Sequence, residues 1–365
     1  GATPKHAWAS AERLRQALRE PFQLGGDTPV TISISIGWTE LAPGHGTPES
    51  VLKEAELAMY RAKAAGRDQV CRFEPAMHAE LVHHEALVQD LRRAITDETF
   101  DLHLQAQVDR AGEVIGAEAL LRWMRPSGER VPPDVFIPIA EDNGLIFPLG
   151  DWVLRRACAC LVAWSRQPAL CDLSLAVNVS ARQFAQAGFV DSVRGALSIT
   201  GAVASRLKLE ITETAVLEDF HETAAKLAEL RALGVKVSLD DFGTGYSSLA
   251  YLTRLPLDQL KIDRSFVDRL PEDRNDAMVA QTIIGMGRGL GLDVIAEGVE
   301  TEAQRNFLMA QGCDAFQGYL VARPMPREAF EAMLDQRMDA RQVAGGPRQP
   351  GGSFPRVGRR HRNAS

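Results

Sequence analysis

Acidic and amide side chains stand at the carboxyl ends of five short apolar stretches that are predicted to form β-strands. The five residues are Glu118, Asn178, Glu210, Asp240 and Glu297. In each stretch the polar side chain falls on the face opposite the apolar row that would pack against helices, because side chains alternate across a strand. A single acid in such a place is usually a solvated loop residue or a helix N-cap. Five of them together indicate a site that needs clustered oxygen atoms.

The chemistry of these side chains favours divalent cations and phosphodiester cleavage. Clustered carboxylates repel one another at low dielectric unless cations lie between them. Oxygen ligands without His or Cys favour Mg²⁺ or Mn²⁺ over zinc. The adjacent acids Asp240 and Asp241 suggest that one carboxylate is shared by two ions and that the next binds only one. Two ions about 4 Å apart suit in-line displacement at a phosphodiester.

The elements that must position these residues run from about residue 99 to residue 340. The predicted strands span residues 101–108, 113–120, 173–179, 206–212, 235–240, 258–262, 292–297 and 314–317. The predicted helices span residues 134–142, 149–166, 181–198, 221–233, 272–290 and 301–311. Strands alternating with helices are typical of a parallel sheet covered by helices, and this number of strands matches an α/β fold, a (β/α)8 TIM-like barrel. Active sites of such barrels form at the carboxyl ends of the strands, where the five polar residues stand.

The first 76 residues follow a different pattern. A helix that ends near Arg19 precedes an alternating strand over residues 30–36, and a second helix spans residues 48–65. A unit of this size buries too little surface to be stable by itself, so we expect it to be part of a truncated α+β domain. Residues 77–98 form a linker helix, with Leu87, Leu91 and Ile95 on one stripe.

The charge is unevenly distributed along the chain. The 41 basic and 48 acidic residues give a net charge of −7, yet residues 341–365 carry six Arg and one of the eight His but no acid. This segment is rich in Gly and Pro and is predicted to be a basic disordered tail after the barrel at 99–340. Because the rest of the chain is acidic, we expect no binding to nucleic-acid duplexes, which requires basic surface.

The apolar stretches and the cysteines indicate in which cellular compartment the protein is expected to lie. No apolar stretch reaches the roughly 18–20 residues of a membrane helix, and the N-terminus lacks a signal-peptide pattern. Five cysteines without a CxxC pair fit reduced thiols. We therefore expect a cytoplasmic location and no membrane segment within this chain, while an upstream region could tether the full-length protein to a membrane.

Residues 99–336 closely resemble the EAL domain, the family of cyclic-di-GMP phosphodiesterases. The matching motifs are Glu118-Ala119-Leu120-Leu121-Arg122-Trp123, Phe136–Glu141, Asn178-Val179-Ser180 with Gln183-Phe184, Leu209–Glu213, Asp240–Leu249, Leu260–Phe266, Ala296–Thr301 and Gln317-Gly318-Tyr319. The number and order of these motifs make the resemblance specific, whereas the tripeptide Glu118-Ala119-Leu120 alone would carry no information. The resemblance implies metal-dependent hydrolysis of cyclic-di-GMP to linear pGpG.

Carried over position by position, the resemblance implies a role for each matching residue. The metal ligands of the EAL family correspond to Glu118, Asn178, Glu210, Asp240 and Asp241, which would hold two Mg²⁺ or Mn²⁺ ions. Ca²⁺ is expected to inhibit the hydrolysis. The catalytic pair of the family corresponds to Glu297 as general base and Lys261 as a point charge beside the water or phosphate. Supporting residues correspond to Glu300 and Gln317, and substrate contacts to Gln105 and Arg122. An alternative for Arg122 is a cation–π pair with Trp123.

Glu213 and the loop over residues 240–248 distinguish two functional hypotheses. In the family this loop positions the second metal and couples to dimerisation, and the acid that matches Glu213 holds it in place. Both are present here, which favours catalysis and implies a homodimer through the EAL domain. The alternative is a receptor that binds cyclic-di-GMP and signals without cleaving it.

The N-terminal segment resembles the C-terminal part of a GGDEF, or diguanylate cyclase, domain. The matching pieces are Ser35-Ile36-Gly37, Ala58–Lys63 and Gly66-Arg67. In that family the residues that match Lys63 and Arg67 contact nucleotide phosphates. The GGDEF loop and the metal-binding Asp of the family lie upstream of the matched part and are not in this chain, so we expect no cyclase activity from it.

Overall fold

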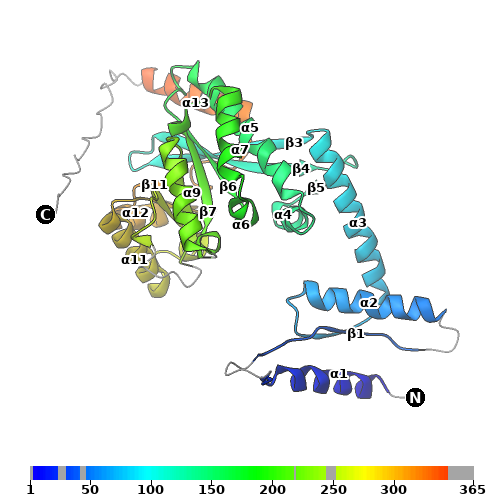
Figure 1. Ribbon diagram of the computed structural model, residues 1–365. Coiled ribbons are helices and arrows are strands. Elements are labelled where there is room, and N and C mark those ends of the chain that lie inside the picture. Colours follow the sequence, from blue (N-terminus) through cyan, green and yellow to red (C-terminus); the bar gives the residue numbers. More distant parts are fainter. Residues whose placement is uncertain (1–2, 24–29, 42–46, 218, 244–251, 344–365) are drawn as a thin grey trace. The chain divides into compact units, whose positions relative to one another are not determined.

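The structure is a computed structural model that describes residues 3–23, 30–41, 47–217, 219–243 and 252–343. The chain forms two compact units, Gly1–Arg93 and Ala94–Ser365, and each is described by itself (Figure 1). The predicted basic tail lies outside the described residues beyond residue 343, as does most of the predicted loop over residues 240–248.

The first unit contains helices and a short parallel strand pair. Its elements are α1 (Pro4–Arg19), β1 (Ile36–Trp38), α2 (Pro48–Ala64), β2 (Val70–Arg72) and α3 (Pro75–Thr96), whose last residues belong to the second unit. Strand β1 pairs with β2 in parallel, with Gly37 opposite Cys71. A Cβ atom on Gly37 would lie 2.1 Å from the carbonyl oxygen of Ala55, so this glycine lets α2 approach the strand.

The predicted strand over residues 30–36 is wrong for most of its length. Only Ile36 belongs to β1, and Val30 instead forms an isolated bridge with Phe22. Residues 31–35 have no strand partner among the described residues. Alternation of apolar and polar residues therefore predicted a strand where no neighbouring strand satisfies the backbone hydrogen bonds. The two predicted helices of this unit, which end near Arg19 and span residues 48–65, are confirmed.

The second unit contains all of the predicted barrel strands. Its strands are β3 (Phe100–Asp109), β4 (Val114–Met124), β5 (Arg130–Val131), β6 (Ser174–Val179), β7 (Leu207–Thr212), β8 (Lys236–Phe242), β9 (Gln259–Ile262), β10 (Asp293–Ala296), β11 (Ala315–Gln317) and β12 (Met325–Pro326). Its helices are α4 (Pro133–Asp142), α5 (Ile146–Ser165), α6 (Ala181–Ala185), α7 (Phe189–Thr200), α8 (Glu213–Leu217), α9 (Phe220–Ala232), α11 (Arg274–Leu290), α12 (Glu302–Gln311) and α13 (Arg327–Val343), with short 3-10 turns at Ala204–Arg206 and Arg264–Phe266.

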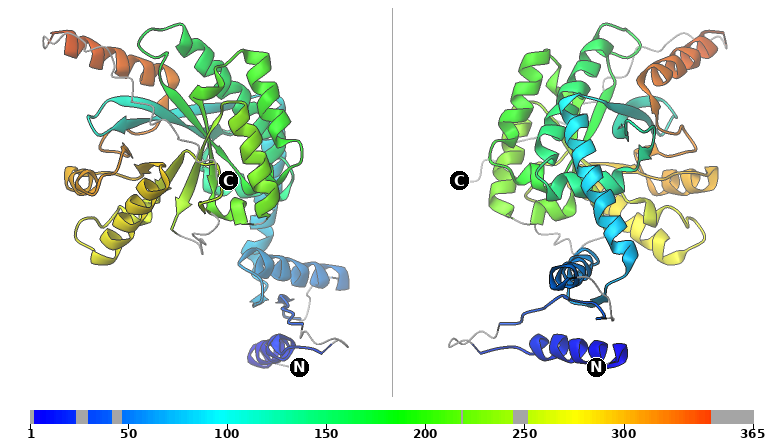
Figure 2. Two further views of the ribbon diagram at one scale, coloured as in Figure 1. Left: turned by 60° about the vertical axis from the view of Figure 1, so that its left-hand side comes forward. Right: turned by 90° about the vertical axis from the view of Figure 1, so that its right-hand side faces the viewer.

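These strands close into a barrel. Going around it, the order is β3, β4, β6, β7, β8, β9, β10 and β11, and β11 pairs with β3 to complete the circle. Helices lie around the outside of the strands in the two views of Figure 2. The predicted TIM-like barrel of the α/β class is thus confirmed.

One feature of the barrel differs from the prediction of a parallel sheet. Strand β3 runs antiparallel to both of its neighbours in the barrel, β4 and β11. A tight turn joins β3 to β4, in which the Asp109 carboxylate accepts hydrogen bonds from the backbone N–H groups of Ala111 and Glu113. Parallel neighbours require a long crossover connection, so a turn of this length can join only antiparallel strands.

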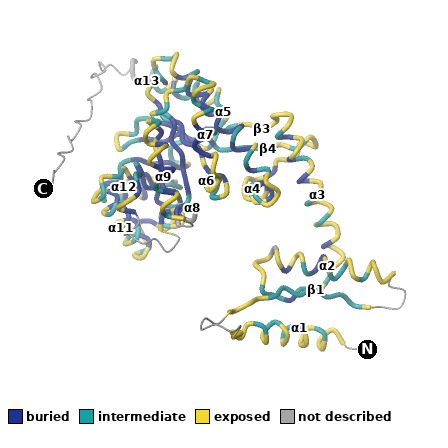
Figure 3. The backbone as a smooth tube through the Cα atoms, viewed as in Figure 1, coloured by how far each residue is buried: buried dark blue, intermediate teal, exposed yellow. Residues whose placement is uncertain are grey.

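The helices follow the predicted limits with one exception. The predicted helix over residues 181–198 is two helices, α6 and α7, because Gln186 after α6 is extended. Helix α6 begins with a capping box between Ser180 and Gln183, which fixes the chain direction directly after β6. The strands and the inward faces of the helices carry the buried residues, and the outward faces of the helices are exposed (Figure 3). Within the described part of the chain, no helix is both long enough and apolar enough to cross a membrane.

A substitution at Gly318 can test the close packing next to β11. A Cβ atom at this position would lie 2.1 Å from the carbonyl oxygen and 2.3 Å from the nitrogen of Val299, and backbone atoms cannot move aside. We expect Gly318→Ala to lower the free energy of unfolding by about 1–3 kcal/mol. Gly285→Ala is the control, because Gly285 is exposed in α11 with nothing near its Cβ position, and it should raise that free energy by about 0.5–1 kcal/mol. Chemical denaturation of the two variants measures both values, and equal stabilities would contradict the packing.

Candidate metal and active site

The strands bring the predicted polar residues to one end of the barrel. Glu118 comes from β4, Asn178 from β6, Glu210 from β7 and Asp240 from β8, while Glu297 follows β10 directly. Asn178 lies opposite Glu210 in the parallel pairing of β6 with β7, so their side chains leave the sheet side by side. The carboxyl ends of these strands therefore form the site that the sequence predicts.

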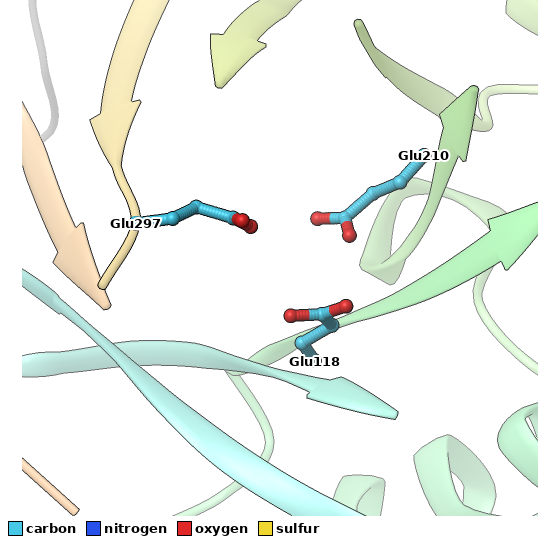
Figure 4. A group of neighbouring side chains, drawn as sticks. All are labelled: Glu118, Glu210 and Glu297. Atoms are coloured by element: carbon cyan, nitrogen blue, oxygen red, sulfur yellow. The ribbon is translucent and has the colours of Figure 1, made fainter. Parts of the chain in front are cut away.

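Three glutamates face one another inside this end of the barrel. Figure 4 shows the carboxylates of Glu118 on β4, Glu210 on β7 and Glu297 just after β10 pointing toward a common centre. One oxygen of each lies within 4.8 Å of the others. Burial raises the pKa of Glu210 to about 8, and the neighbouring acids Glu118 and Asp240 add to the rise, against the opposing effect of Lys261. The site thus holds more negative charge than it stabilises with its own cations.

Lys261 is the buried cation of this cluster. It projects from β9, is 1% exposed, and its Nζ lies 2.6 Å from Glu210 Oε2, 3.1 Å from Asp240 Oδ1 and 2.5 Å from Glu297 Oε1. Burial acts to lower the pKa of Lys261, but the surrounding carboxylates outweigh it and hold the pKa well above the usual value. The surrounding carboxylates therefore favour the charged form of this ammonium group, which links β9 to β7, β8 and the end of β10.

The oxygen atoms of the site that have no hydrogen-bond partner fit a hard divalent cation as ligands. The second oxygen of Glu210, Oε1, is buried and has no hydrogen-bond partner among the described residues. A buried carboxylate oxygen without a partner is costly, and a cation bound beside it would remove that cost. The atoms that converge here are oxygens, which favour Mg²⁺ or Mn²⁺. The residues present therefore fit the metal that the sequence predicts.

Amide side chains hold Glu118 in place. Asn178 Nδ2 donates to Glu118 Oε1 at 2.5 Å, and Gln317 Nε2 donates to Glu118 Oε2. Gln317 also donates to Gln105 Oε1 at 3.2 Å and accepts from Gln107 Nε2 at 2.9 Å. Because the nitrogen of Asn178 is engaged by Glu118, its carbonyl oxygen is the atom left to bind a cation.

Gln107 is a member of this network that the sequence reasoning missed. It is 1% exposed and lies two residues after Gln105 on β3, so the two side chains share the inner face of the barrel. The same alternation that identified the strand-end acids could have found it. Gln105, predicted to contact substrate, donates its Nε2 hydrogen bond to the carbonyl of Ala322.

The two adjacent acids of β8 have different environments. Asp240 is buried, and its Oδ1 accepts a hydrogen bond from the backbone N–H of Asp241 at 2.9 Å. Asp241 has a φ of 53°, a left-handed conformation that is uncommon outside glycine, and the pairing of β8 with β9 is irregular between Leu239 and Phe242. Consecutive side chains of a regular strand point to opposite faces, so an irregularity at this point is what the prediction of two adjacent metal-binding acids requires.

Glu213 contacts the start of the loop that follows β8. It is the first residue of α8 and is buried, and its Oε2 accepts a hydrogen bond from the backbone N–H of Gly243 at 3.4 Å. Glu300, predicted to support the catalytic residues, does not reach Lys261 through any described hydrogen bond. Its carboxylate pairs with Arg264 at 3.1 Å and is 39% exposed.

Arg122 lies on the same strand face as Glu118, four residues further along β4. Its Nη1 donates to the carbonyl of Leu121, and its Nε is buried with no hydrogen-bond partner in the described residues. The alternative of a cation–π pair with Trp123 is wrong, because neighbouring side chains of a strand point to opposite faces. The Trp123 ring is 1% exposed and packs against Phe100 and Phe136.

Comparison with known proteins identifies relatives over most of the chain. The chain is 45% identical over 333 residues to the bifunctional diguanylate cyclase/cyclic di-GMP phosphodiesterase MucR of Pseudomonas aeruginosa, covering 91% of this chain and 48% of MucR. It is 44% identical over 329 residues to the cyclic di-GMP phosphodiesterase NbdA of the same organism, covering 89% of this chain and 41% of NbdA. The chain thus spans about half the length of these curated relatives.

Solved structures and family models agree with these relatives. The structure of the MucR phosphodiesterase in complex with c-di-GMP superposes with a TM-score of 0.65 at 47% identity, covering 67% of this chain and 99% of that one. Residues 2–69 match the diguanylate cyclase, GGDEF domain, and residues 88–324 match the EAL domain. The match to the EAL domain covers more than half of the chain, so the chain belongs to the EAL domain family.

Proposed function

We propose that this chain hydrolyses cyclic-di-GMP to linear pGpG with the help of divalent cations, Mg²⁺ or Mn²⁺. The observation that carries the proposal is the convergence of Glu118, Glu210 and Glu297 around a buried lysine at the carboxyl end of the barrel. The names of MucR and NbdA, both phosphodiesterases for this dinucleotide, support the choice of substrate.

Five residues would hold the cations. They are Glu118, Asn178, Glu210, Asp240 and Asp241, all placed at or near the carboxyl ends of barrel strands. Divalent ions in such a site supply Lewis-acid stabilisation of the charge that develops on the phosphate oxygens. Gln317 and Asn178 keep the Glu118 carboxylate in one orientation, which preserves the site before any ion arrives.

Glu297 and Lys261 would carry out the proton transfer and the charge stabilisation. Glu297 is the general base that takes a proton from the attacking water, and burial raises the pKa of its carboxyl well above the usual value, so it binds a proton readily. Lys261 stays charged beside it and stabilises negative charge as the phosphodiester bond breaks. Arg122 has an unpartnered buried Nε and would contact a substrate phosphate, and Gln105 would line the substrate side of β3.

Four further expectations accompany this proposal. Glu213, through Gly243, would hold the start of the loop after β8. Glu300, paired with Arg264, would act on the site only indirectly. Homodimerisation through the EAL domain and a cytoplasmic location both stay predictions.

The catalytic proposal is tested by an isosteric change of one carboxylate. Glu118→Gln keeps the shape of the side chain but removes the negative charge that a cation requires, so pGpG formation should fall by roughly a thousandfold or more, as when charge-stabilising groups of an active site are removed. Chromatographic detection of pGpG in Mg²⁺ or Mn²⁺, with and without EDTA, measures this. Glu302→Gln, a change to an exposed acid of α12, is the control and should retain full activity. A folded Glu118→Gln protein with unchanged turnover would contradict the mechanism.

The enzyme and the receptor hypotheses predict different results with two cations. Isothermal titration calorimetry with cyclic-di-GMP in Ca²⁺ should show binding without turnover, while a product assay in Mg²⁺ should show cleavage. Ca²⁺ prefers more ligands and longer distances than Mg²⁺, so it is expected to support binding but not chemistry. Binding in both conditions without pGpG in either would establish the receptor instead.

The buried lysine makes a separate prediction about stability. Lys261→Met removes the cation that three carboxylates share, so in EDTA the free energy of unfolding should fall by about 3–5 kcal/mol. Mn²⁺ should recover part of that loss, because a bound cation replaces the missing positive charge. The exposed Lys236 has no ion pair among the described residues, so Lys236→Met is the control. Thermal unfolding in EDTA and in Mn²⁺ gives both comparisons, and a Lys261→Met protein as stable as wild type in EDTA would refute the account.

A further inference from the structure

A second polar cavity lies at the opposite end of the barrel from the carboxylates. Its volume is about 460 Å³. It is lined by the first residues of four strands, Ser174 of β6, Lys236 of β8, Gln259 of β9 and Asp293 of β10. Because the catalytic residues stand at the carboxyl ends of the same strands, the cavity at the amino ends is a separate site.

Lys208 supplies a buried positive charge to this cavity. It is the second residue of β7, is 6% exposed, and lines the cavity wall. Its Nζ donates one hydrogen bond, at 2.8 Å, to the neutral side-chain oxygen of Gln259. An ammonium group has three N–H donors, and no carboxylate accepts from this one among the described residues. A buried charge in this condition favours an anionic partner.

Two further cations of the cavity have no ionic partner among the described residues. Arg231 and Lys236 line it, are exposed, and form no ion pair with any residue that the structure describes. Two of the three acids in the lining are already engaged. Asp172 pairs with Arg206 at 2.5 Å, and Asp258 Oδ2 accepts a hydrogen bond from the backbone N–H of Val237 at 2.9 Å.

The charge balance that remains is positive. With Asp172 paired to Arg206, Lys208, Lys236 and Arg231 contribute three positive charges, and Asp258 and Asp293 contribute two negative charges. The difference, 3 − 2 = 1, leaves the lining with an excess of positive charge, which favours an anionic ligand. The volume lies in the range of sites for small molecules, so the cavity has room for more than a bare ion.

We propose that this basal cavity binds the phosphate group of a small molecule, with Lys208 as the buried anchor and Lys236 and Arg231 at its opening. The Lys208–Gln259 pair lies one step below the Glu210–Lys261 pair on the inner faces of β7 and β9. A ligand here is therefore one layer of side chains from the carboxylate cluster.

Inorganic phosphate is the first probe, titrated into the whole chain in EDTA by calorimetry. The wild type should bind it, Lys208→Met should weaken binding about tenfold or more, and Lys236→Ala should weaken it several-fold because a point charge is lost. The control is Arg166→Ala, which removes an exposed arginine that does not line the cavity and should leave binding unchanged. Crystals soaked in tungstate, a heavy-atom analogue of phosphate, should show the anion beside Lys208.

A second arm uses AMP in place of phosphate. Tighter binding of AMP that is lost in Lys208→Met assigns the cavity to a phosphorylated metabolite, whereas equal affinities assign it to free phosphate, and both outcomes support the site. Absence of binding at millimolar phosphate and AMP would reduce the cavity to a hydrated space and overturn the proposal. Binding that persists in Lys208→Met, or tungstate found elsewhere, would overturn it too. If Lys208→Met fails to fold, the double variant Lys236→Ala with Arg231→Ala decides the question.

Discussion

The structure of the barrel depends on a single buried ammonium group among carboxylates. Lys261 lies between Glu210, Asp240 and Glu297, so that residues from β7, β8 and β9 and from the end of β10 meet at one positive charge. Without it, several acids would share a low-dielectric space with nothing to offset their repulsion. With it, the site is still short of positive charge, and the unpartnered oxygen of Glu210 marks where a further cation fits.

The antiparallel strand β3 supplies buried amide side chains to this cluster. It closes the barrel between β4 and β11, and its inward side chains Gln105 and Gln107 form hydrogen bonds with Gln317. Gln317 in turn fixes Glu118. Metal-binding carboxylates are commonly oriented by such neighbours, which keep the ligand atoms in place before the ion is bound. The two ends of the barrel differ in charge, because carboxylates are in excess around Lys261 and cations are in excess in the cavity around Lys208.

Much of this site could be predicted because strands impose a simple rule. Glu118, Glu210 and Glu297 interrupt apolar stretches at positions of fixed parity, and parallel strands deliver their ends to one rim. The same rule failed at residues 30–36, where alternation occurs without a partner strand, and it could not show that β3 is antiparallel. The support of the catalytic residues by Glu300 stays a prediction from its position in a motif, and its contact with Arg264 depends on where the chain turns after β10.

The amino-acid order by itself determined the barrel class, the strands and the acidic residues at their ends, because those follow from the local alternation of apolar and polar side chains. Only the tertiary structure decided which of these groups touch. The approach of Lys261 to three acids, the link from Gln107 through Gln317 to Glu118, and the cavity around Lys208 all join residues that are far apart in the chain. Closing a barrel brings opposite strands face to face across its interior, and the pattern of a single strand holds no information about which side chains it will meet there.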